Sequence, residues 1–498
     1  MLITLATSLL ALATPPASSL TLRVDPTTPL HVTRRSFLGV NIDSASLYYG
    51  LDFTNPGLGR VAAAIGRTRS DPSQDPRTDL RIGGSTAESV VFGNATTPAN
   101  NVPVSAEYLR TMFHFATMSN MDVVFDLNCM NQRIRNTTTH EDLGWNSTNA
   151  EALLTFIASR PAMRRALRAV QLGNEPGHWL SENPGAPTAA QHGADFRSLR
   201  ALLDRIFHPY AKDAPPPIIQ GPDVCFGLGH MGPTGFDKCS NLTYFKTLLN
   251  SAGDAIKEVT VHSYALANNI HNKSESECNT VSQLLNFSLF EATMTTTLRD
   301  WRTAQLAEAP NATIVLSETA TAGDGGCANL SNTFASSFIY MNLLRLASSL
   351  GYSRVYRQDL VGWSGISTAS SYALAGDPGW TNGSLAANPD LFVTMLWKQL
   401  VGVQVLKSSF STIPSEEEEE EEDSYVRKHV RIHAACAGGD YTSINTVTVA
   451  FVNAGGSRVE LHLDEDATSG LTPISNPRNG PFMWSLTSGK ECFVSNLI

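Results

Sequence analysis

The sequence predicts an α/β protein: a (β/α)8 barrel of the TIM-barrel class, followed by a C-terminal β-sandwich domain. Three observations lead to this prediction. Short β-branched runs alternate with longer segments of helical periodicity. The short runs number eight, and eight alternating repeats favour a closed parallel barrel over an open sheet. After about residue 400, strand-like segments follow one another directly, which is typical of antiparallel sheet.

Each barrel strand is expected where β-branched and apolar residues form a short run. The eight runs are residues 37–42, 80–82, 123–127, 169–172, 218–220, 259–261, 314–316 and 354–356. Between them, segments such as 149–157 and 334–346 have the apolar spacing of amphipathic helices. The chain has 498 residues, which is enough for a barrel and a smaller second domain.

Four parts are expected along the chain. Residues 1–18 have the pattern of a secretory signal peptide, and residues 19–35 are expected to form a strand that joins the β-sandwich. Residues 36–399 form the expected catalytic barrel, and residues 400–498 the expected β-sandwich. The last part should contain consecutive antiparallel strands at 425–435, 446–453 and 458–463, and an acidic loop at 415–424.

The net charge of −10 comes mostly from that acidic segment. Seven glutamates, Glu416 to Glu422, and Asp423 supply eight negative charges, which leaves −2 for the rest of the chain. Because adjacent like charges repel, we expect the run to be a disordered surface loop, with a calcium or partner site as the alternative. No basic excess or motif indicates nucleic acid as a partner.

The first residues indicate secretion. Residues 2–12 are apolar, and Ala11-Leu12-Ala13 supplies small residues for cleavage; a buried N-terminal strand or helix is the alternative. One Asn-X-Ser/Thr sequon would mean little, but nine indicate a glycosylating pathway. The sequons begin at Asn94, Asn136, Asn146, Asn241, Asn272, Asn286, Asn311, Asn329 and Asn382. We therefore expect a secreted, extracellular glycoprotein, and no later segment has the length and apolarity of a membrane span.

The seven cysteines fit no zinc-binding spacing, so no metal site is expected from them. Some should form disulfides in an oxidising compartment. Cys225 and Cys239 flank one Gly-rich loop, and Cys436 and Cys492 lie in the same C-terminal region. The odd number leaves at least one cysteine free, and we expect Cys129, at the end of an apolar run, to be a buried thiol.

Polar side chains follow six of the eight strands. Active sites of such barrels lie at the carboxyl ends of the strands, so these side chains should face one common mouth. In strand order they are Asp43, Arg81 with Ser85, Asn174 with Glu175, His262 with Tyr264, Glu318, and Gln358.

Glu175 and Glu318 form the pair with the clearest chemistry. They follow the fourth and seventh strands, whose ends can place two carboxyl groups about 5 Å apart across the mouth. One carboxylic acid can protonate a glycosidic oxygen while the other carboxylate attacks the sugar, and this reaction needs no metal or organic cofactor. We expect Glu175 to be the general acid/base, with a raised pKa, and Glu318 to be the nucleophile.

Several segments together resemble a known family. Asn174-Glu175-Pro176 after a fourth strand, with a glutamate after the seventh, resembles clan A of the glycoside hydrolases. The ordered segments FLGVNID, LRIGGST, GWNSTNAE, QLGNEP, SETATAGDGG, NTFASSF, RQDLVGW and NPDLFVTMLWKQLVGVQVL resemble the heparanase-like family, glycoside hydrolase family 79. Family members cleave β-linked glucuronic acid. The resemblance therefore implies a retaining β-glucuronidase that acts on oligo- or polysaccharides containing glucuronic acid.

The resemblance also implies roles for matching residues. Asn174 would hydrogen-bond the sugar 2-hydroxyl, Asp43 would accept hydrogen bonds from hydroxyls on the far side of the ring, and Tyr264 would support the nucleophile. The Gly325-Gly326 backbone and Tyr372 would bind the sugar carboxylate, since N–H groups and a phenol can satisfy it without an arginine. The remaining members of the expected site are Ser85 and His262 at the substrate, with Arg81 and Gln358 as supporting residues.

Alternatives remain open for single residues and for the function. His262 could be a structural histidine beneath the site, and Asp43 could cap a helix. The protein could be another clan A retaining glycosidase that acts on neutral sugars, or a non-catalytic carbohydrate-binding protein that keeps the fold. The presence of both Glu175 and Glu318 argues against a non-catalytic protein.

Overall fold

The computed structural model describes residues 18–67, 77–93, 101–139, 141–177, 186–227, 242–265, 285–323, 325–327, 330–362, 371–376, 385–412, 419–437, 446–454, 459–463, 471–474 and 485–488. The predicted signal peptide lies outside them apart from Ser18. The sequons at Asn94, Asn241, Asn272, Asn329 and Asn382 also lie outside the described residues.

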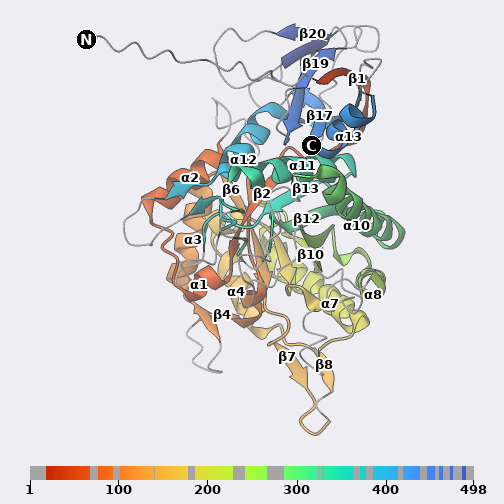
Figure 1. The fold of residues 1–498 in the computed structure, drawn as a ribbon. Helices are drawn as coiled ribbons and strands as arrows, with labels where there is room; N and C mark the ends of the chain where they lie inside the picture. The colour runs from red at the N-terminus through yellow and green to blue at the C-terminus, as the bar shows by residue number, and fades with distance from the viewer. Residues whose placement is uncertain are drawn as a thin grey trace, which may run out of the picture.

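Eight parallel strands close into a barrel in the order β10-β11-β12-β13-β2-β3-β6-β9 (Figure 1). Each of the eight expected runs overlaps one of these strands, which confirms the predicted barrel. In chain order the strands are β2 (Leu38–Asp43), β3 (Thr78–Gly83), β6 (Met121–Leu127), β9 (Leu167–Leu172), β10 (Ile218–Gly227), β11 (Glu258–Tyr264), β12 (Thr313–Thr319) and β13 (Arg354–Arg357).

Helices surround the barrel, and their ends follow local capping rules. Asn55 accepts the N–H groups of Gly57 and Leu58 ahead of α2, and Thr188 and Gln191 form a capping box at α7. The helices are α1 (Ala45–Tyr48), α2 (Pro56–Gly66), α3 (Ala106–Met118), α4 (Thr148–Ala158), α5 (Pro161–Ala166), α7 (Ala189–Phe207), α8 (Leu242–Ala252), α10 (Phe287–Glu308), α11 (Phe334–Ser349) and α12 (Pro389–Leu400). Short 3-10 turns are η2 (Ser85–Ser89), η3 (His208–Tyr210) and η4 (Gly253–Ala255).

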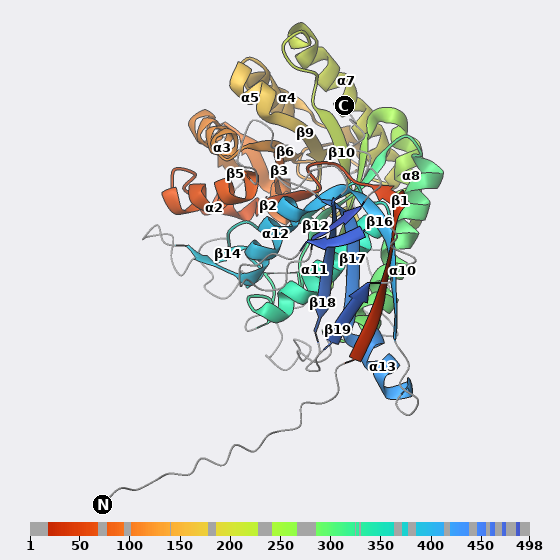
Figure 2. The same ribbon diagram turned by 90° about the horizontal axis from the view of Figure 1, so that it is seen from above.

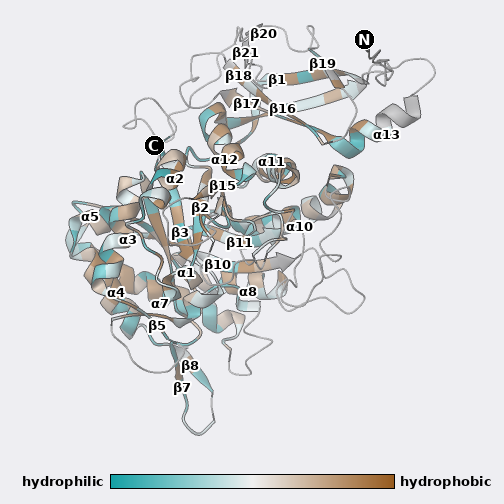
Figure 3. Ribbon diagram, turned by 60° about the vertical axis from the view of Figure 1, so that its left-hand side comes forward, coloured by the Kyte–Doolittle hydropathy of each residue, from teal (hydrophilic) through white to brown (hydrophobic). Residues whose placement is uncertain are grey.

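Apolar residues fill the space between the strands and the helices. The strands are buried on both faces, as parallel strands covered by helices must be, whereas the helices mix polar and apolar residues (Figure 3). Strands β3 and β12 illustrate this, because nearly every residue in them is buried. The helix α11 (Phe334–Ser349) was expected at 334–346, and α4 (Thr148–Ala158) at 149–157.

Charged side chains also lie inside the barrel, close to the amino ends of the strands. We name this group, Asp79, Arg168, Glu258, Arg354 and Tyr356, the floor cluster. Arg168 lies 2.7 Å from Asp79 and 3.0 Å from Glu258. Arg354 contacts the same two carboxylates at 2.7 and 3.4 Å, and the Tyr356 hydroxyl donates to Asp79 at 2.7 Å. Two guanidinium groups therefore face two carboxylates.

The C-terminal region forms a seven-stranded sheet in the order β19-β1-β16-β17-β18-β21-β20. Figures 1 and 2 show this sheet on one side of the barrel, next to α11 and α12. The N-terminal strand belongs to it, pairing antiparallel with β16 and parallel with β19. The strands are β1 (Ser18–Val32), β16 (Val401–Thr412), β17 (Val430–Ala437), β18 (Thr446–Asn453), β19 (Val459–Leu463), β20 (Leu471–Ile474) and β21 (Ser485–Ser488). The exact domain boundaries stay predictions.

One expectation for this sheet was wrong in its pairing. Residues 446–453 and 458–463 were expected as consecutive antiparallel strands, but β18 and β19 are not neighbours. β19 instead adds to β1, in parallel, at the edge of the sheet. The apolar pattern places both strands correctly, but it does not say which edge a strand joins.

The acidic segment was also predicted incorrectly in part. Its second half opens a helix, α13 (Glu419–His429), and the expected strand at 425–435 begins only at Val430. Glutamate is a good helix former, and acidic residues favour the positive end of a helix dipole. Arg427, Lys428 and His429 lie in the last turn, where positive charge is favoured, and Val426 is buried under the sheet. Residues 413–418 lie outside the described part.

Short pairs of strands extend from the barrel loops. β4 (Val90–Phe92) pairs with β5 (Val102–Val104), β7 (Arg133–Arg135) with β8 (Asp142–Trp145), and β14 (Ala375–Gly376) with β15 (Ala386–Ala387). The hairpin β7–β8 projects from the same end of the molecule as α1 and β4 (Figure 1).

The states of four cysteines can be compared with the expectations. Cys129 is a free, buried thiol as expected, and Cys225, Cys327 and Cys436 are disulfide-bonded. The expected partners Cys239 and Cys492 lie outside the described residues. Among the residues that the structure describes, no helix has the length and apolarity needed to cross a membrane.

Candidate active site

Buried ionisable side chains gather at the carboxyl ends of the barrel strands. We name Arg81, Glu175, Asp223, His262 and Glu318 the mouth cluster. Four of them come from strands β3, β10, β11 and β12, and Glu175 follows β9. The two-residue period of a strand turns the end residues into the barrel, so distant parts of the sequence meet there.

Arg81 connects the cluster. The side chain is fully buried and donates to Glu318 at 2.8 Å, to Asn174 at 2.8 Å and to Asp223 at 3.2 Å. Gly83 leaves room for the guanidinium group, because a Cβ atom there would lie 2.6 Å from its central carbon. Any larger residue at position 83 would therefore displace Arg81 from Glu318.

Glu318 is held at both carboxylate oxygens. Arg81 donates to Oε2, and the Tyr264 hydroxyl donates to Oε1 through a short hydrogen bond. Burial, and then the charge of Glu318, raise the pKa of Tyr264, so its hydroxyl stays protonated and remains a donor. These donors fix the orientation of the carboxylate.

Glu175 lies on the loop after β9 with a backbone conformation that is rare for a side chain of its size. Its φ is 48°, and Asp223 next to it has φ 52°. The N–H of Glu175 donates to the carbonyl of Asp223 at 3.1 Å, so the two unusual residues support each other. Left-handed non-glycine residues cost energy and gather at functional sites.

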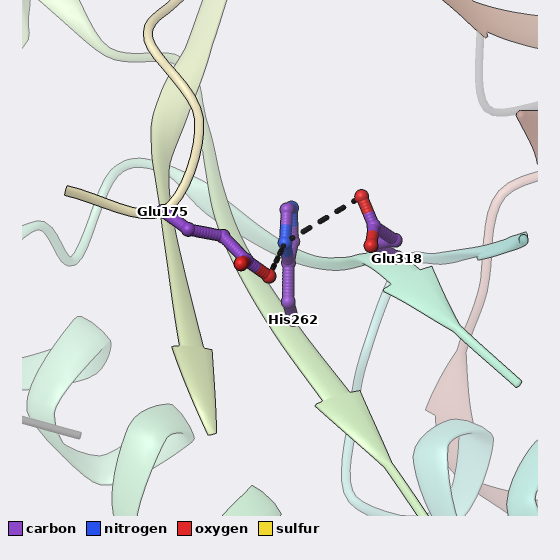
Figure 4. A group of neighbouring side chains, drawn as sticks. All are labelled: Glu175, His262 and Glu318. Atoms are coloured by element: carbon purple, nitrogen blue, oxygen red, sulfur yellow. Dashed lines mark hydrogen bonds and ion pairs between the residues drawn. The ribbon is translucent and has the colours of Figure 1, made fainter. Parts of the chain in front are cut away.

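His262 lies between the two glutamates (Figure 4). Its Nδ1 is 2.8 Å from Glu175 and 3.7 Å from Glu318, and its Nε2 is 3.3 Å from Asp223. Burial alone would lower the pKa of His262, but the charges of Glu318 and Asp223 and the contact with Glu175 outweigh it and raise the pKa to about 10. Burial would likewise raise the pKa of Asp223, yet Arg81 and His262 hold it well below its usual range.

Glu175, His262 and Glu318 are close enough to act on one small group. One ligand atom from each, a carboxylate oxygen or a ring nitrogen, lies within 4.8 Å of the others. Such a trio could in principle hold a metal ion. However, a protonated imidazole has no free lone pair, and Arg81 and Tyr264 already occupy both oxygens of Glu318. The donor set therefore suits proton transfer and nucleophilic attack better than metal binding.

A second group of predicted residues lies beside the mouth cluster. Gln358 donates to Asp43 at 3.0 Å and to the Tyr372 hydroxyl at 3.4 Å. The N–H of Tyr372 donates to the Gly325 carbonyl at 3.2 Å, which places the tyrosine against the glycine pair. Burial, with a contribution from the charge of Glu318, raises the pKa of Asp43 to about 7. Asp43 also caps α1, since its Oδ1 accepts the N–H of Ala45 at 2.8 Å.

Part of the chain matches a known family. Residues 100–345, just under half of the chain, match the family described as Glycosyl hydrolase family 79, N-terminal domain. The chain is therefore similar to glycoside hydrolase family 79. This confirms the resemblance seen in the sequence motifs.

The relatives of this chain include heparanases, a hyaluronoglucuronidase and a protein named as inactive. Heparanase of Bos taurus is 27% identical over 309 residues, which is 62% of this chain and 48% of that protein. Hyaluronoglucuronidase of Hirudo nipponia is 25% identical over 391 residues, 75% of this chain and 67% of that protein. Inactive heparanase-2 of Mus musculus is 23% identical over 367 residues, 73% of this chain and 53% of that protein. The chain spans about half the length of the heparanases it matches.

A solved structure shares the fold. The 4-O-alpha-L-rhamnosyl-beta-D-glucuronidase from Fusarium oxysporum 12S has a TM-score of 0.53 and 14% identity. The match covers 88% of this chain and 82% of that chain. At this identity the likeness concerns the fold alone.

Three predicted site residues make contacts that do not by themselves indicate substrate binding. Ser85 begins η2 and is exposed, without a hydrogen bond to the mouth cluster. His262 is fully buried between the two glutamates. The N–H of Gly326 already donates to the Gly323 carbonyl at 2.8 Å. Within the described residues, Gly325 is thus the member of the glycine pair whose N–H has no internal acceptor. The substrate contacts of all these residues stay predictions.

Four residues of the site were not foreseen from the sequence. Asp126 and Asp223 come from β6 and β10, the third and fifth barrel strands, whose ends were left out of the list of polar strand ends. Asp126 directly follows the apolar run in VVFD, and Asp223 follows the apolar pair of IIQGPD after three residues; an acid near such a run is the signal that would have found them. Gln171 binds Arg81 at 2.7 Å from within β9. Glu88 lies in η2, with no motif that marks it.

Proposed function

We propose that this chain is a secreted retaining β-glucuronidase that hydrolyses β-linked glucuronic acid in glycans. Glu175 is the general acid/base and Glu318 is the nucleophile. The single observation that carries the proposal is the closeness of Glu175, His262 and Glu318. One carboxylate oxygen or ring nitrogen from each lies within 4.8 Å of the others. Retaining enzymes hold the two carboxyl groups about 5–5.5 Å apart, whereas inverting enzymes separate them by about 6.5–9.5 Å to admit a water molecule.

In the first step, the Glu318 carboxylate attacks the anomeric carbon while Glu175 gives its proton to the glycosidic oxygen. The bond to the leaving group breaks, and an ester forms between the sugar and Glu318. Glu175 becomes negatively charged in this step. The Nδ1 of His262, 2.8 Å away, then donates to the new carboxylate and stabilises it.

In the second step, Glu175 takes a proton from a water molecule as the water oxygen attacks the anomeric carbon. The ester bond breaks, and Glu318 regains its negative charge. Arg81 and Tyr264 stabilise the departing carboxylate, because both already donate to it in the free protein. Two inversions give a product with the β configuration of the substrate.

Recognition of a uronic acid is assigned to Tyr372 and the Gly325 N–H. The carboxylate of the sugar would accept hydrogen bonds from the Tyr372 hydroxyl and the Gly325 N–H, on two residues whose backbones are hydrogen-bonded to each other. Asp43 and Asn174 would bind ring hydroxyls, and Gln358 would orient Asp43 and Tyr372 together. Hyaluronoglucuronidase among the relatives supports a substrate that contains glucuronic acid.

Secretion and glycosylation are part of the proposal. Three disulfide-bonded cysteines support an oxidising compartment. The sequon asparagine Asn311 is exposed, and Asn136, Asn146 and Asn286 are partly exposed, as glycan attachment requires.

The proposal is tested by a panel of three aryl glycosides: a β-glucuronide, a β-glucoside and an α-arabinofuranoside. We expect turnover of the β-glucuronide well above that of the other two, and loss of it in Glu318→Gln. Glu107→Gln, an exposed change of the same type on α3, serves as the matched control and should keep full turnover. Preference for a neutral glycoside would place the protein among other clan A activities. No turnover of any member would favour a non-catalytic protein such as the inactive relative.

A further inference from the structure

The loop that carries Glu175 is held by three acceptors from other elements, two on strands β6 and β10 and one on the turn η2. The N–H of Gly173 donates to Asp126 Oδ1 at 3.0 Å. The N–H of Asn174 donates to Glu88 Oε1 at 2.9 Å. The N–H of Glu175 donates to the Asp223 carbonyl at 3.1 Å. Three consecutive backbone donors are thereby fixed from outside the loop.

Glu88 is the acceptor that links this loop to a neighbouring one. Its second oxygen, Oε2, accepts the N–H groups of Cys129 at 2.9 Å and Met130 at 2.6 Å, on the loop after β6. One buried carboxylate therefore accepts three backbone hydrogen bonds and joins η2, the β6 loop and the β9 loop. Burial raises the pKa of Glu88 to about 7, and these three N–H groups oppose the rise.

The position of Glu175 gives this link a catalytic consequence. Its left-handed backbone, at φ 48°, must be maintained by its surroundings, because such conformations cost about 1–3 kcal/mol. Glu88 accepts the N–H of Asn174, the residue immediately before Glu175. Displacement of a catalytic group by about 1 Å can cost about a hundredfold in rate.

We propose that Glu88 is a positioning residue that holds Asn174 and Glu175 so that the Glu175 carboxyl group reaches the leaving oxygen. This inference rests on the proposed function, in which Glu175 is the general acid. Glu88 itself touches neither the substrate nor the reacting atoms. Its effect should therefore be largest where protonation of the leaving group matters, with a smaller effect through Asn174 on any leaving group.

The test is the ratio of kcat/KM for two aryl β-glycosides of the same sugar in one Glu88→Gln preparation. The amide keeps the shape of the side chain but turns an NH2 group toward at least one backbone N–H, which breaks a hydrogen bond. The 2,4-dinitrophenyl glycoside needs little protonation and should keep its rate within about threefold. A glycoside with an unsubstituted phenyl or sugar leaving group should lose about tenfold to a hundredfold. The fraction of folded protein cancels in the ratio.

Asp195→Asn is the matched control. Asp195 is a buried carboxylate that accepts the N–H of Trp145 at 3.2 Å and pairs with Arg133, away from the β9 loop. We expect it to change the melting temperature as Glu88→Gln does, but to leave the rate ratio unchanged. Glu88→Asp, which keeps a carboxylate, should restore part of the ratio. Equal losses on both leaving groups in Glu88→Gln would overturn the proposal.

Failure of the proposed function can be told apart from failure of this inference. If the wild type prefers another sugar, the same ratio is measured on aryl glycosides of that sugar. If the wild type has no turnover at all, amide hydrogen exchange of residues 173–175 gives the answer. These amides should be protected in the wild type and lose protection in Glu88→Gln but not in Asp195→Asn. Equal protection in all three proteins would contradict the positioning role.

Discussion

The two ends of the barrel hold buried charge in different ways. In the floor cluster, the carboxylates of Asp79 and Glu258 each contact two guanidinium groups, Arg168 and Arg354. Burial opposes ionisation of Glu258, but these two arginines lower its pKa to about 2. The floor thus pairs two carboxylates with two guanidinium groups. We expect such a group to stabilise the closed barrel and to take no part in proton transfer.

The mouth cluster has more acids than bases. Arg81 is the one arginine in it, and it donates to Glu318 and Asp223 while Glu175 lies near His262. The pKa of His262 rises to about 10 and that of neighbouring Asp43 to about 7. An imbalance of charge thus leaves groups that can take and release protons, which is what acid/base catalysis needs.

The same strands build both ends. β3 supplies Asp79 to the floor and Arg81 to the mouth, and β11 supplies Glu258 and His262. Side chains two residues apart point to the same face of a strand, so successive inward positions form layers along the barrel axis. A charged residue near the amino end of a strand therefore joins the floor cluster, whereas one near the carboxyl end joins the mouth cluster.

The largest expected effect comes from comparing one glutamate at each end. Glu318→Gln should lower turnover by about 10⁴-fold or more, because the nucleophile is lost. Its melting temperature should change little, because Arg81 keeps Asp223 as a partner at 3.2 Å. Glu258→Gln should lower the free energy of unfolding by about 3–5 kcal/mol, because it leaves buried arginines partly unpaired. Its turnover per folded molecule should stay close to wild type. Urea unfolding and aryl β-glucuronide kinetics on both variants measure these effects.

An opposite pattern would break the comparison. If Glu258→Gln abolished turnover while remaining stable, the floor cluster would have to act on the site. If Glu318→Gln unfolded the protein, the mouth cluster would be a structural element like the floor.

A smaller effect is expected from Tyr372→Phe. The change removes one hydroxyl that is proposed to bind the sugar carboxylate, and hydrogen bonds to charged groups are worth about 1.5–3 kcal/mol. We expect kcat/KM to fall about tenfold or more on an aryl β-glucuronide and much less on the matching glucoside. Tyr340→Phe, another buried hydroxyl, 3.4 Å from Thr394, is the control. Equal losses on both sugars would remove Tyr372 from carboxylate recognition.

The smallest effect is a dependence of stability on pH that arises at the mouth. The folded protein keeps a proton on His262 up to about pH 10, whereas the unfolded chain releases it near the ordinary value of 6.5. This stabilisation is complete below pH 6.5 and is lost as the pH rises toward 10. Asp43 and Glu88 have pKa values of about 7 in the folded protein, above the ordinary values for carboxyl groups. Their protonation therefore stabilises the folded state at low pH, and this stabilisation is lost as the pH rises through about 7.

The melting temperature should therefore fall by a few degrees between pH 7 and pH 9. His262→Gln should flatten this slope. Tyr356→Phe, a change in the floor cluster, should lower the melting temperature but keep the slope. A slope that is unchanged in His262→Gln would show that other groups titrate in this range.

The barrel was predictable because its signals are local. Short apolar runs and helical periodicity located all eight strands, and the acids after the fourth and seventh strands located Glu175 and Glu318. The pairing of β19 with β1 was not predictable, since it joins segments far apart in the sequence. The start of α13 was missed because charge repulsion was weighed above the helix propensity of glutamate.

Parts of the site depend on contacts that a single sequence does not contain. Asp126 and Asp223 could have been found by treating the third and fifth strand ends like the others. Glu88 could not, because a glutamate in a short turn is usually solvated, and only the meeting of three loops buries it. The charge state of His262 likewise depends on Glu318 and Asp223, which come from two other strands.

The most direct test of the central claim is the anomeric configuration of products rescued by azide from two variants. Glu318→Ala lacks the nucleophile, so azide should attack the β-glucuronide directly and give an α-glucuronyl azide by one inversion. Glu175→Ala should still form the glycosyl-enzyme from a good leaving group, and azide should then give a β-glucuronyl azide. NMR of the two products decides between the roles. The opposite configurations would exchange Glu175 and Glu318, and release of the α-sugar first by the wild type would show that the enzyme is inverting.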